Sequence, residues 1–347
     1  MFRGGQSAHT LAGFNWSDYA EKRSPRTMDK FNMGKKGLNL GKSVHSTNSN
    51  AEYLFLVNPS SGKASIQKKR DLVSKVSRHS NAITLISESE DHASQLAKDA
   101  MLEGRIVVAC GGDGLQNIVA QQAIDTGGVM SVLPFGRGND FAASMQIRSF
   151  RDTELAIKNG VVQHARYVNV EFSDYSRICL TCAGVGLLSD ASLRASRLPL
   201  LKGKALYTVA ALISLMKLKC HRYTLSFDDV ELQKELLILV GAASECTGGG
   251  VRIAPDAKSE PDRLNVLFAT SQGRTSAIKL LVKALSGKHL AHDKVESNFH
   301  ERCRIACEND NYGASLVYGD GEYLGVLPAS LQIGNKPLRV LVPNANA

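Results

Sequence analysis

Short apolar runs alternate with helix-like segments over the first half of the chain. Continuous apolar runs at 53–57, 82–86, 106–109 and 129–133 predict buried strands. The segments at about 65–79, 91–103 and after residue 114 have the apolar spacing of helices. Strands that alternate with helices indicate a parallel sheet built from right-handed βαβ units.

Strand-like runs dominate the second half. They lie at 167–172, 178–183, 223–229, 235–243, 264–270, 304–310, 315–325 and 338–343, with one helical segment at 276–285. This pattern predicts a mainly antiparallel second domain. We therefore expect an α/β domain over 51–163 and a β-rich domain over 164–343.

Two further segments have their own composition. Residues 1–50 are rich in Gly, Ser, Asn, Lys and Arg and have no apolar periodicity, so we expect a disordered or loosely attached segment. Residues 200–219 are the most apolar helix-like stretch and carry lysines at both ends. A core helix is favoured there over a lipid-facing helix.

Three glycine-bearing polar turns follow three of the predicted strands. Their sequences are NPSSGK at 58–63, GGDG at 111–114 and PFGRGND at 134–140. Free N–H groups of glycine loops that open onto a helix N-terminus favour phosphate. Because the carboxyl ends of parallel strands share one edge of a sheet, three such turns in succession predict a nucleotide site.

The carboxylate in the second turn needs a separate explanation. Asp113 lies where an anion would repel phosphate, so it has a role such as holding Mg²⁺ or accepting a hydroxyl proton. The alternative is a tight turn with an aspartate cap.

Charge and composition restrict the classes of partner that the protein could bind. The 347 residues carry a net charge of +9, which suits anionic partners. Neither a basic stripe nor interleaved aromatics supports nucleic-acid binding. No apolar run reaches the ~18 to 20 residues that span a bilayer, so we expect a cytoplasmic protein with peripheral membrane contact. The seven scattered cysteines predict reduced thiols without zinc; Cys179 and Cys182 would lie on opposite faces of one strand.

The motifs together resemble those of the diacylglycerol kinase catalytic-domain family, which includes sphingosine kinases, ceramide kinases and bacterial lipid kinases. The resemblance rests on NPSSGK, on GGDG with Asn117, and on LPFGRGNDFA at 133–142, and it extends over about 53–342. It implies a Rossmann-like nucleotide domain, shared with NAD kinases and phosphofructokinases, followed by a β-sandwich domain. It also implies ATP-dependent, Mg²⁺-assisted phosphorylation of a lipid hydroxyl.

The resemblance also implies roles for individual residues. Residues of the three turns would bind ATP: Asn58, Pro59, Ser61, Gly62, Lys63, Gly111, Gly112, Gly114, Asn117, Gly136, Arg137, Gly138, Asn139 and Asp140. A hairpin at 320–322 would bring a carboxylate back to the nucleotide domain, where Asp320 or Glu322 accepts the proton of the acceptor hydroxyl while Asp113 helps to hold Mg²⁺.

Two more aspartates belong to the implied site. Asp262 follows the triple glycine 248–250 and would be a second Mg²⁺ ligand. Asp190 follows a glycine turn at 184–186 and would lie near the lipid; the alternative is that Asp190 caps a helix.

Three positions depart from the family pattern and keep alternatives open. Leu115, Ile118 and Arg137 stand where the family has threonine, glutamate and threonine. A nucleotide or lipid sensor with little catalysis is therefore one alternative, and an NAD kinase-like enzyme is another. The acceptor could be diacylglycerol, ceramide or a sphingoid base, and the oligomeric state stays open, with a homodimer as one alternative.

Overall fold

The computed structural model describes residues 45–46, 51–195, 203–216, 220–227, 230–270, 273–307 and 312–344. Apart from residues 45–46, the segment expected to be disordered, 1–50, lies outside the described residues.

The first sheet contains the predicted parallel strands. Its order is β1 (His45–Ser46), β6 (Val161–Ala165), β18 (Leu338–Val342), β5 (Val129–Pro134), β4 (Ile106–Gly111), β2 (Glu52–Val57) and β3 (Asn81–Ile86). The five strands from β18 to β3 are parallel, whereas β6 and β1 are antiparallel to their neighbours. The predicted α/β architecture is confirmed.

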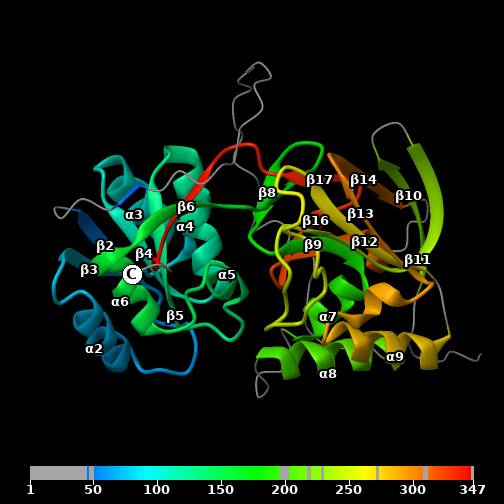
Figure 1. The fold of residues 1–347 in the computed structure, drawn as a ribbon, viewed down its shortest axis with the longest axis horizontal. Helices are drawn as coiled ribbons and strands as arrows, with labels where there is room; N and C mark the ends of the chain where they lie inside the picture. The colour runs from blue at the N-terminus through cyan, green and yellow to red at the C-terminus, as the bar shows by residue number, and fades with distance from the viewer. Residues whose placement is uncertain are drawn as a thin grey trace, which may run out of the picture. The chain divides into compact units, whose positions relative to one another are not determined.

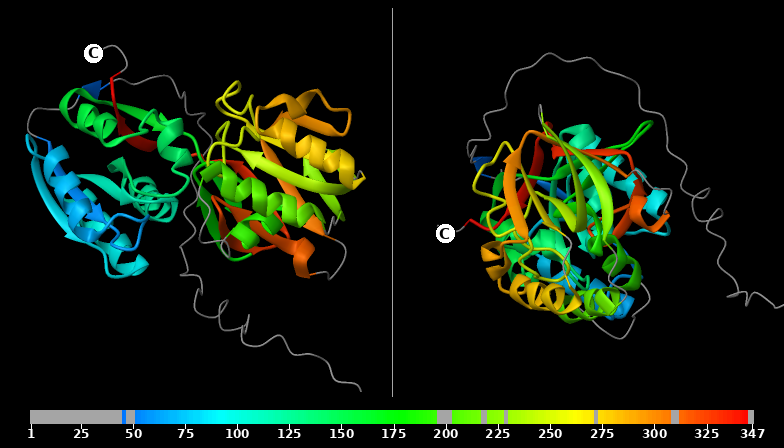
Figure 2. Two further views of the ribbon diagram at one scale, coloured as in Figure 1. Left: turned by 90° about the horizontal axis from the view of Figure 1, so that it is seen from below. Right: turned by 90° about the vertical axis from the view of Figure 1, so that its right-hand side faces the viewer.

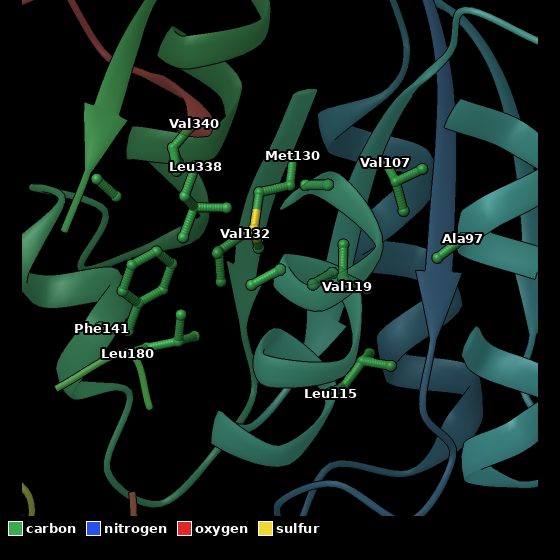
Figure 3. Close-up of a cluster of buried hydrophobic side chains, with 14 of the residues drawn as sticks. Ala97, Val107, Leu115, Val119, Met130, Val132, Phe141, Leu180, Leu338 and Val340 are labelled. Carbon is green, nitrogen blue, oxygen red and sulfur yellow. The ribbon is translucent and has the colours of Figure 1, made fainter. Parts of the chain in front are cut away.

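Helices cover both faces of this sheet (Figures 1 and 2). They are α2 (Ile66–Val76), α3 (Glu90–Leu102), α4 (Asp113–Thr126), α5 (Asp140–Ser144) and α6 (Phe150–Asn159). Alternate strand residues pack on opposite faces, so the central strands β2 and β4 are apolar and buried over almost their whole length. One face forms a core with α3 and α4 that includes Val107, Val119 and Val132 (Figure 3). The other packs against α2 and α6.

The last strand corrects the predicted domain limits. We expected 338–343 in the second domain, but β18 pairs in parallel with β5 and antiparallel with β6 in the first sheet. The boundary expected after residue 163 falls inside β6. The reason is that β18 is buried on both faces, which a central position in a helix-covered sheet provides.

The second sheet is antiparallel throughout, as predicted. Its order is β16 (Glu322–Val326), β15 (Leu316–Gly319), β9 (Cys182–Gly186), β11 (Val230–Ala242), β10 (His221–Phe227), β14 (Arg302–Cys307), β17 (Ala329–Ile333), β7 (Val168–Glu171) and β8 (Ser176–Cys179). β12 (Leu264–Thr270) pairs with β11 and with β13 (Val295–His300). Both β13 and β17 were missed. The sequence of β13 is mostly polar, whereas β17 has the alternation of a strand but is only five residues long.

The remaining helices of this lobe include α7 (Leu187–Ala195), α8 (Gly203–Met216) and α9 (Arg274–Ala284), with α8 and α9 side by side (Figure 1). η1 (Lys288–Ala291) and the short α10 (Tyr312–Ser315) lie in connections. Ala210, Ala211 and Leu215 of α8 are buried, which agrees with the core-helix interpretation of this segment. Among the described residues, no helix combines the length and apolar character needed to cross a bilayer.

The strand predicted over 178–183 is wrong as a single element. It is two strands, β8 and β9, separated by Leu180 and Thr181. Cys179 and Cys182 therefore lie on different strands, and both are buried free thiols. The glycine turn expected at 184–186 is instead part of β9, because it pairs with 238–240 of β11.

Candidate active site

The three glycine-bearing turns line one large pocket. Each begins where a parallel strand ends: the first directly after β2, the second and third at the last residues of β4 and β5. The lining residues from these turns are Asn58, Ser60, Ser61, Gly62, Gly112, Asp113, Gly114, Gly136, Arg137 and Gly138. Lys63 is exposed on the first turn and is not among the lining residues. The pocket thus collects most of the residues expected to bind ATP.

A buried lysine that we did not predict holds the first turn. Lys69 is fully buried, and its Nζ donates to the carbonyl oxygens of Asn58 (2.9 Å) and Pro59 (2.7 Å). The Ser61 hydroxyl also donates to the Asn58 carbonyl, at 3.0 Å. Burial lowers the pKa of Lys69. Lys69 is spaced four and seven residues from Val73 and Val76, the other buried residues of α2. This spacing places it on the buried face of the helix and could have predicted its burial.

Replacing Lys69 with methionine should loosen this turn. The two carbonyls would lose their charged donor, so we expect Lys69→Met to lower the free energy of unfolding by about 2 kcal/mol and to weaken ATP binding. Urea unfolding and a titration with ATP measure both effects. Lys68→Met, at the exposed neighbouring position, is the matched control. Equal behaviour of the two variants would contradict this role.

The second and third turns touch each other. A Cβ on Gly136 would lie 2.6 Å from the Cα of Gly112, so this approach requires glycine. Asn139 stabilises the contact: its Oδ1 accepts the Gly136 N–H (2.9 Å), and its own N–H donates to Asp113 Oδ2 (3.3 Å). The Asn139 side chain therefore shapes the turn that faces the pocket.

The N-terminus of α4 opens at this contact. Gly112 is the N-cap residue and offers no side-chain hydrogen bond to the first turn of α4. The N–H groups and helix dipole at this end favour an anion such as phosphate. Arg137, exposed in the wall of the pocket, adds a positive charge.

Three carboxylates converge beside this helix end. Asp113, Asp140 and Asp320 line a second, smaller pocket. Burial and the charges of Asp140 and Asp320 raise the pKa of Asp113 to about 7. Burial also raises the pKa of Asp140 and of Asp320. The excess of negative charge fits a cation, and Mg²⁺ commonly takes one or two carboxylates together with phosphate oxygens. Among the described residues, no group of three His, Cys, Asp or Glu forms a ready-made metal site.

Metal-free protein should lose stability as pH rises. The pKa of Asp113 is about 7 in the folded protein and near 3.8 ordinarily, so the folded state holds the proton more tightly. The free energy of unfolding should therefore fall by on the order of 3 kcal/mol between about pH 4 and pH 7. Urea unfolding in EDTA measures this slope, which Asp113→Asn should flatten. Equal slopes for the two proteins would be the contrary result.

Asp140 joins the two lobes. Its carboxylate accepts N–H bonds from Gly249 and Gly250, both at 2.7 Å. Gly248, Gly249 and Gly250 have φ values of 62°, 79° and 94°. Successive left-handed residues turn their N–H groups into one concave nest that accepts an anion. The triple glycine thus meets the site through Asp140.

Asp320 is fixed at the tip of the hairpin between β15 and β16. Asp320 (φ 52°) and Gly321 (φ 84°) are the two central residues of its turn, as in a type I′ hairpin. The carboxylate accepts N–H bonds from Leu180 (2.5 Å) and Thr181 (2.9 Å) and the Thr181 hydroxyl bond (2.6 Å). These contacts explain why the expected strand is interrupted at 180–181. The Asn117 Nδ2 of α4 donates a hydrogen bond to Asp320 Oδ2 at 3.5 Å, which links Asp320 to the first lobe.

The other predicted acidic residues lie in different surroundings. Glu322 is exposed in the wall of the large pocket, next to Gly114. Asp190 is in the first turn of α7, so the alternative that it is an N-cap is wrong. Asp262 is exposed, and its charge favours the protonated form of Arg166. The Arg166 guanidinium donates hydrogen bonds to the carbonyl oxygens of Ala257 and Arg263. Asp190 and Asp262 line neither the large pocket nor the carboxylate pocket.

An apolar pocket adjoins the carboxylates. Side chains from α7, α8, α9 and β11 line it, with Leu188, Ala211, Ile238 and Leu281 among them. Asp320 and Gly321 line this pocket and the large polar pocket. A molecule with an apolar body and a polar end could therefore present that end at Asp320.

Two of the three departures from the family pattern, Leu115 and Ile118, pack on the core of the first lobe. Leu115 is buried in the core of the first lobe and packs against Gly111. A Cβ added at Gly111 would lie only 2.7 Å from Leu115 Cδ2. Ile118 packs on the same core, and both residues line the large pocket. The two residues give this part of the pocket wall an apolar character.

Comparison with known proteins identifies both lobes. The family model of the diacylglycerol kinase catalytic domain matches residues 52–171, and the model of the YegS C-terminal NAD kinase beta sandwich-like domain matches residues 181–342. A diacylglycerol kinase of Mycobacterium tuberculosis is 25% identical over 302 residues, covering 83% of this chain and 94% of that protein. A diacylglycerol kinase of Staphylococcus haemolyticus is 23% identical, covering 83% and 87%.

Solved structures agree on the fold. The crystal structure of a diacylglycerol kinase from Bacillus anthracis has a TM-score of 0.64 with 13% sequence identity, and the match covers 86% of this chain and 99% of that one. The two domain matches, in the same order as the two lobes, show that this chain belongs to the diacylglycerol kinase catalytic-domain family of lipid kinases.

Proposed function

We propose that this protein transfers the γ-phosphoryl group of ATP to the hydroxyl group of a lipid, diacylglycerol or a related one. The observation that carries the proposal is the position of Asp320, which lines the polar pocket, the apolar pocket and the small carboxylate pocket between them. A phosphate donor on one side and a lipid on the other would meet at this side chain.

The glycine turns and the N-terminus of α4 would bind the phosphates of ATP. Their N–H groups and Arg137 supply positive potential in the pocket that the three turns line. Asp113, with Asp140 beside it, would hold Mg²⁺, which neutralises phosphate charge when bound. Alignment and charge neutralisation are most of what phosphoryl transfer requires from a protein.

Asp320 is the proposed proton acceptor. Of the five carboxylates that line the large pocket or the carboxylate pocket, Asp140 lines only the small one, and Glu90 and Glu322 line only the large one. Asp113 lines both, and of the five only Asp320 also lines the apolar pocket. Its raised pKa makes it a stronger base than an ordinary aspartate. Asp320 would take the hydroxyl proton while the hydroxyl oxygen attacks the γ-phosphorus.

The apolar pocket favours a lipid acceptor over NAD, whose two nucleotides are polar. The relatives named as diacylglycerol kinases make diacylglycerol the first candidate, with ceramide and sphingoid bases as alternatives. The net charge of +9 would bring the protein to anionic membrane surfaces as a peripheral protein. The apolar Leu115 and Ile118 keep a sensor with slow turnover as the second candidate.

Filling the apolar pocket tests the assignment of the acceptor. Thr208 of α8 lines the pocket, so Thr208→Trp should lower kcat/KM for long-chain lipids at least about tenfold by excluding part of the chain. ATP binding should be unchanged. Met216→Trp, on the same helix at a position that is 71% exposed, is the control. Equal loss in both variants would place the lipid elsewhere.

A further inference from the structure

An open strand forms one edge of the first sheet. Among the described strands, β3 pairs only with β2, while the opposite edge strand is the two-residue β1. β3 contains no charged residue and no proline, and the side chains of Ile83 and Leu85 are 44% and 37% exposed. Sheet edges are commonly protected by charges, proline or a bulge, so an apolar edge of this length suits a pairing partner.

The backbone direction of β3 restricts how a partner can pair. The Ser87 N–H donates to the Val57 carbonyl of β2 at 2.9 Å. Because backbone groups alternate along a strand, Leu85 and Ile83 also direct their N–H and C=O groups to β2. Ala82, Thr84 and Ile86 therefore direct theirs outward.

We propose that β3 pairs antiparallel with β3 of a second copy of this chain, so that the two first sheets become one. With Thr84 opposite Thr84 on the two-fold axis, the outward groups of Ala82, Thr84 and Ile86 all form ladder bonds. Ile83 then lies opposite the partner's Leu85 in the closely spaced type of pair, and vice versa. The exposed apolar side chains cover one another in this register.

The charges that flank β3 favour the same arrangement. Arg78 and His79 precede the strand, and Glu88 follows it; all three are exposed. An antiparallel two-fold brings the basic end of one strand to the acidic end of the other, whereas a parallel pair would bring like charges together. The edge is thus complementary to itself in its exposed apolar side chains, its hydrogen-bonding groups and its flanking charges, which favours a second copy over an unrelated strand.

Cysteine cross-linking tests the partner and the register together. Ile83→Cys and Leu85→Cys chains, each in the otherwise unchanged full-length protein, are oxidised separately and as a mixture. We expect a disulfide-linked dimer in the mixture and little in either alone, because position 83 faces position 85. The unsubstituted protein reports the background from the native thiols. Cross-linking of Ile83→Cys alone would overturn the register.

The mass in solution tests the dimer independently of cysteine chemistry. Light scattering should give twice the chain mass for the unsubstituted protein and the single-chain mass for Leu85→Lys. Leu155→Lys makes the same change at a 51% exposed leucine of α6 and should remain dimeric. A single-chain mass for the unsubstituted protein, or a dimer that survives Leu85→Lys with an unchanged circular dichroism spectrum, would overturn the proposal.

Discussion

Asp320→Asn is expected to lower the rate of lipid phosphorylation by about 10² to 10⁴-fold, the usual contribution of a general base. The amide cannot take the hydroxyl proton. The backbone N–H groups of Leu180 and Thr181 now donate hydrogen bonds to the two carboxylate oxygens. In the variant, the NH₂ group of the amide would face one of these two donors. This mismatch should reduce the free energy of unfolding by about 1 to 3 kcal/mol. A radiolabel assay below the unfolding temperature measures the chemical effect.

Glu322→Gln is the control for the proton acceptor. Glu322 lies two residues away on the same hairpin and lines the polar pocket without lining the apolar one. We expect less than about a tenfold loss from Glu322→Gln, because charge near the phosphates changes but the base remains. A larger loss from Glu322→Gln than from Asp320→Asn would assign the proton to Glu322.

Asp113→Asn should lower phosphoryl transfer by about 10³-fold or more. Its carboxylate is the proposed Mg²⁺ ligand at the N-terminus of α4, where charge neutralisation of the phosphates is needed. Because the variant removes a buried charge that Asp140 and Asp320 repel, it should be at least as stable as the unsubstituted protein above pH 7. Loss of activity with retained stability separates catalysis from folding.

Asp125→Asn is the matched control on the same helix. Asp125 is exposed near the C-terminal end of α4, where it accepts a hydrogen bond from Gln121 at 3.0 Å. Its replacement should leave activity within about a factor of two, as exposed substitutions usually do. If Asp113→Asn kept full activity at saturating Mg²⁺, the proposed metal ligand would be wrong.

The sequence predicted the first lobe well because its signals are local. Apolar runs such as 106–109, followed by a glycine turn, are enough to place a buried parallel strand and the loop at its end. The return of β18 to the first sheet was missed because a short apolar strand carries no sign of which sheet it joins. That choice depends on the burial of both faces in the folded protein.

The candidate site was predicted in part for the same reason. The glycine turns are local sequence motifs and can be recognised directly. The residues that hold these turns in place act through tertiary contacts. Lys69 looks like any helix lysine until its burial is known, and Thr181 lies in a run that reads as continuous strand. The contacts of Asp140 with the backbone of Gly249 and Gly250 link residues that are 109 and 110 positions apart. The periodicity of apolar residues along the chain carries no information about contacts between residues so far apart in the sequence.

The most direct test of the central claim is transfer of the label from γ-labelled ATP, with Mg²⁺, to acceptors in mixed micelles. The panel contains diacylglycerol, ceramide and a sphingoid base, with NAD as the soluble acceptor. The account predicts label in a lipid, diacylglycerol first, and its loss in Asp320→Asn and Asp113→Asn. Label in NAD alone, or no label in any acceptor while ATP still binds, would contradict the assignment as a lipid kinase with an active site at Asp320.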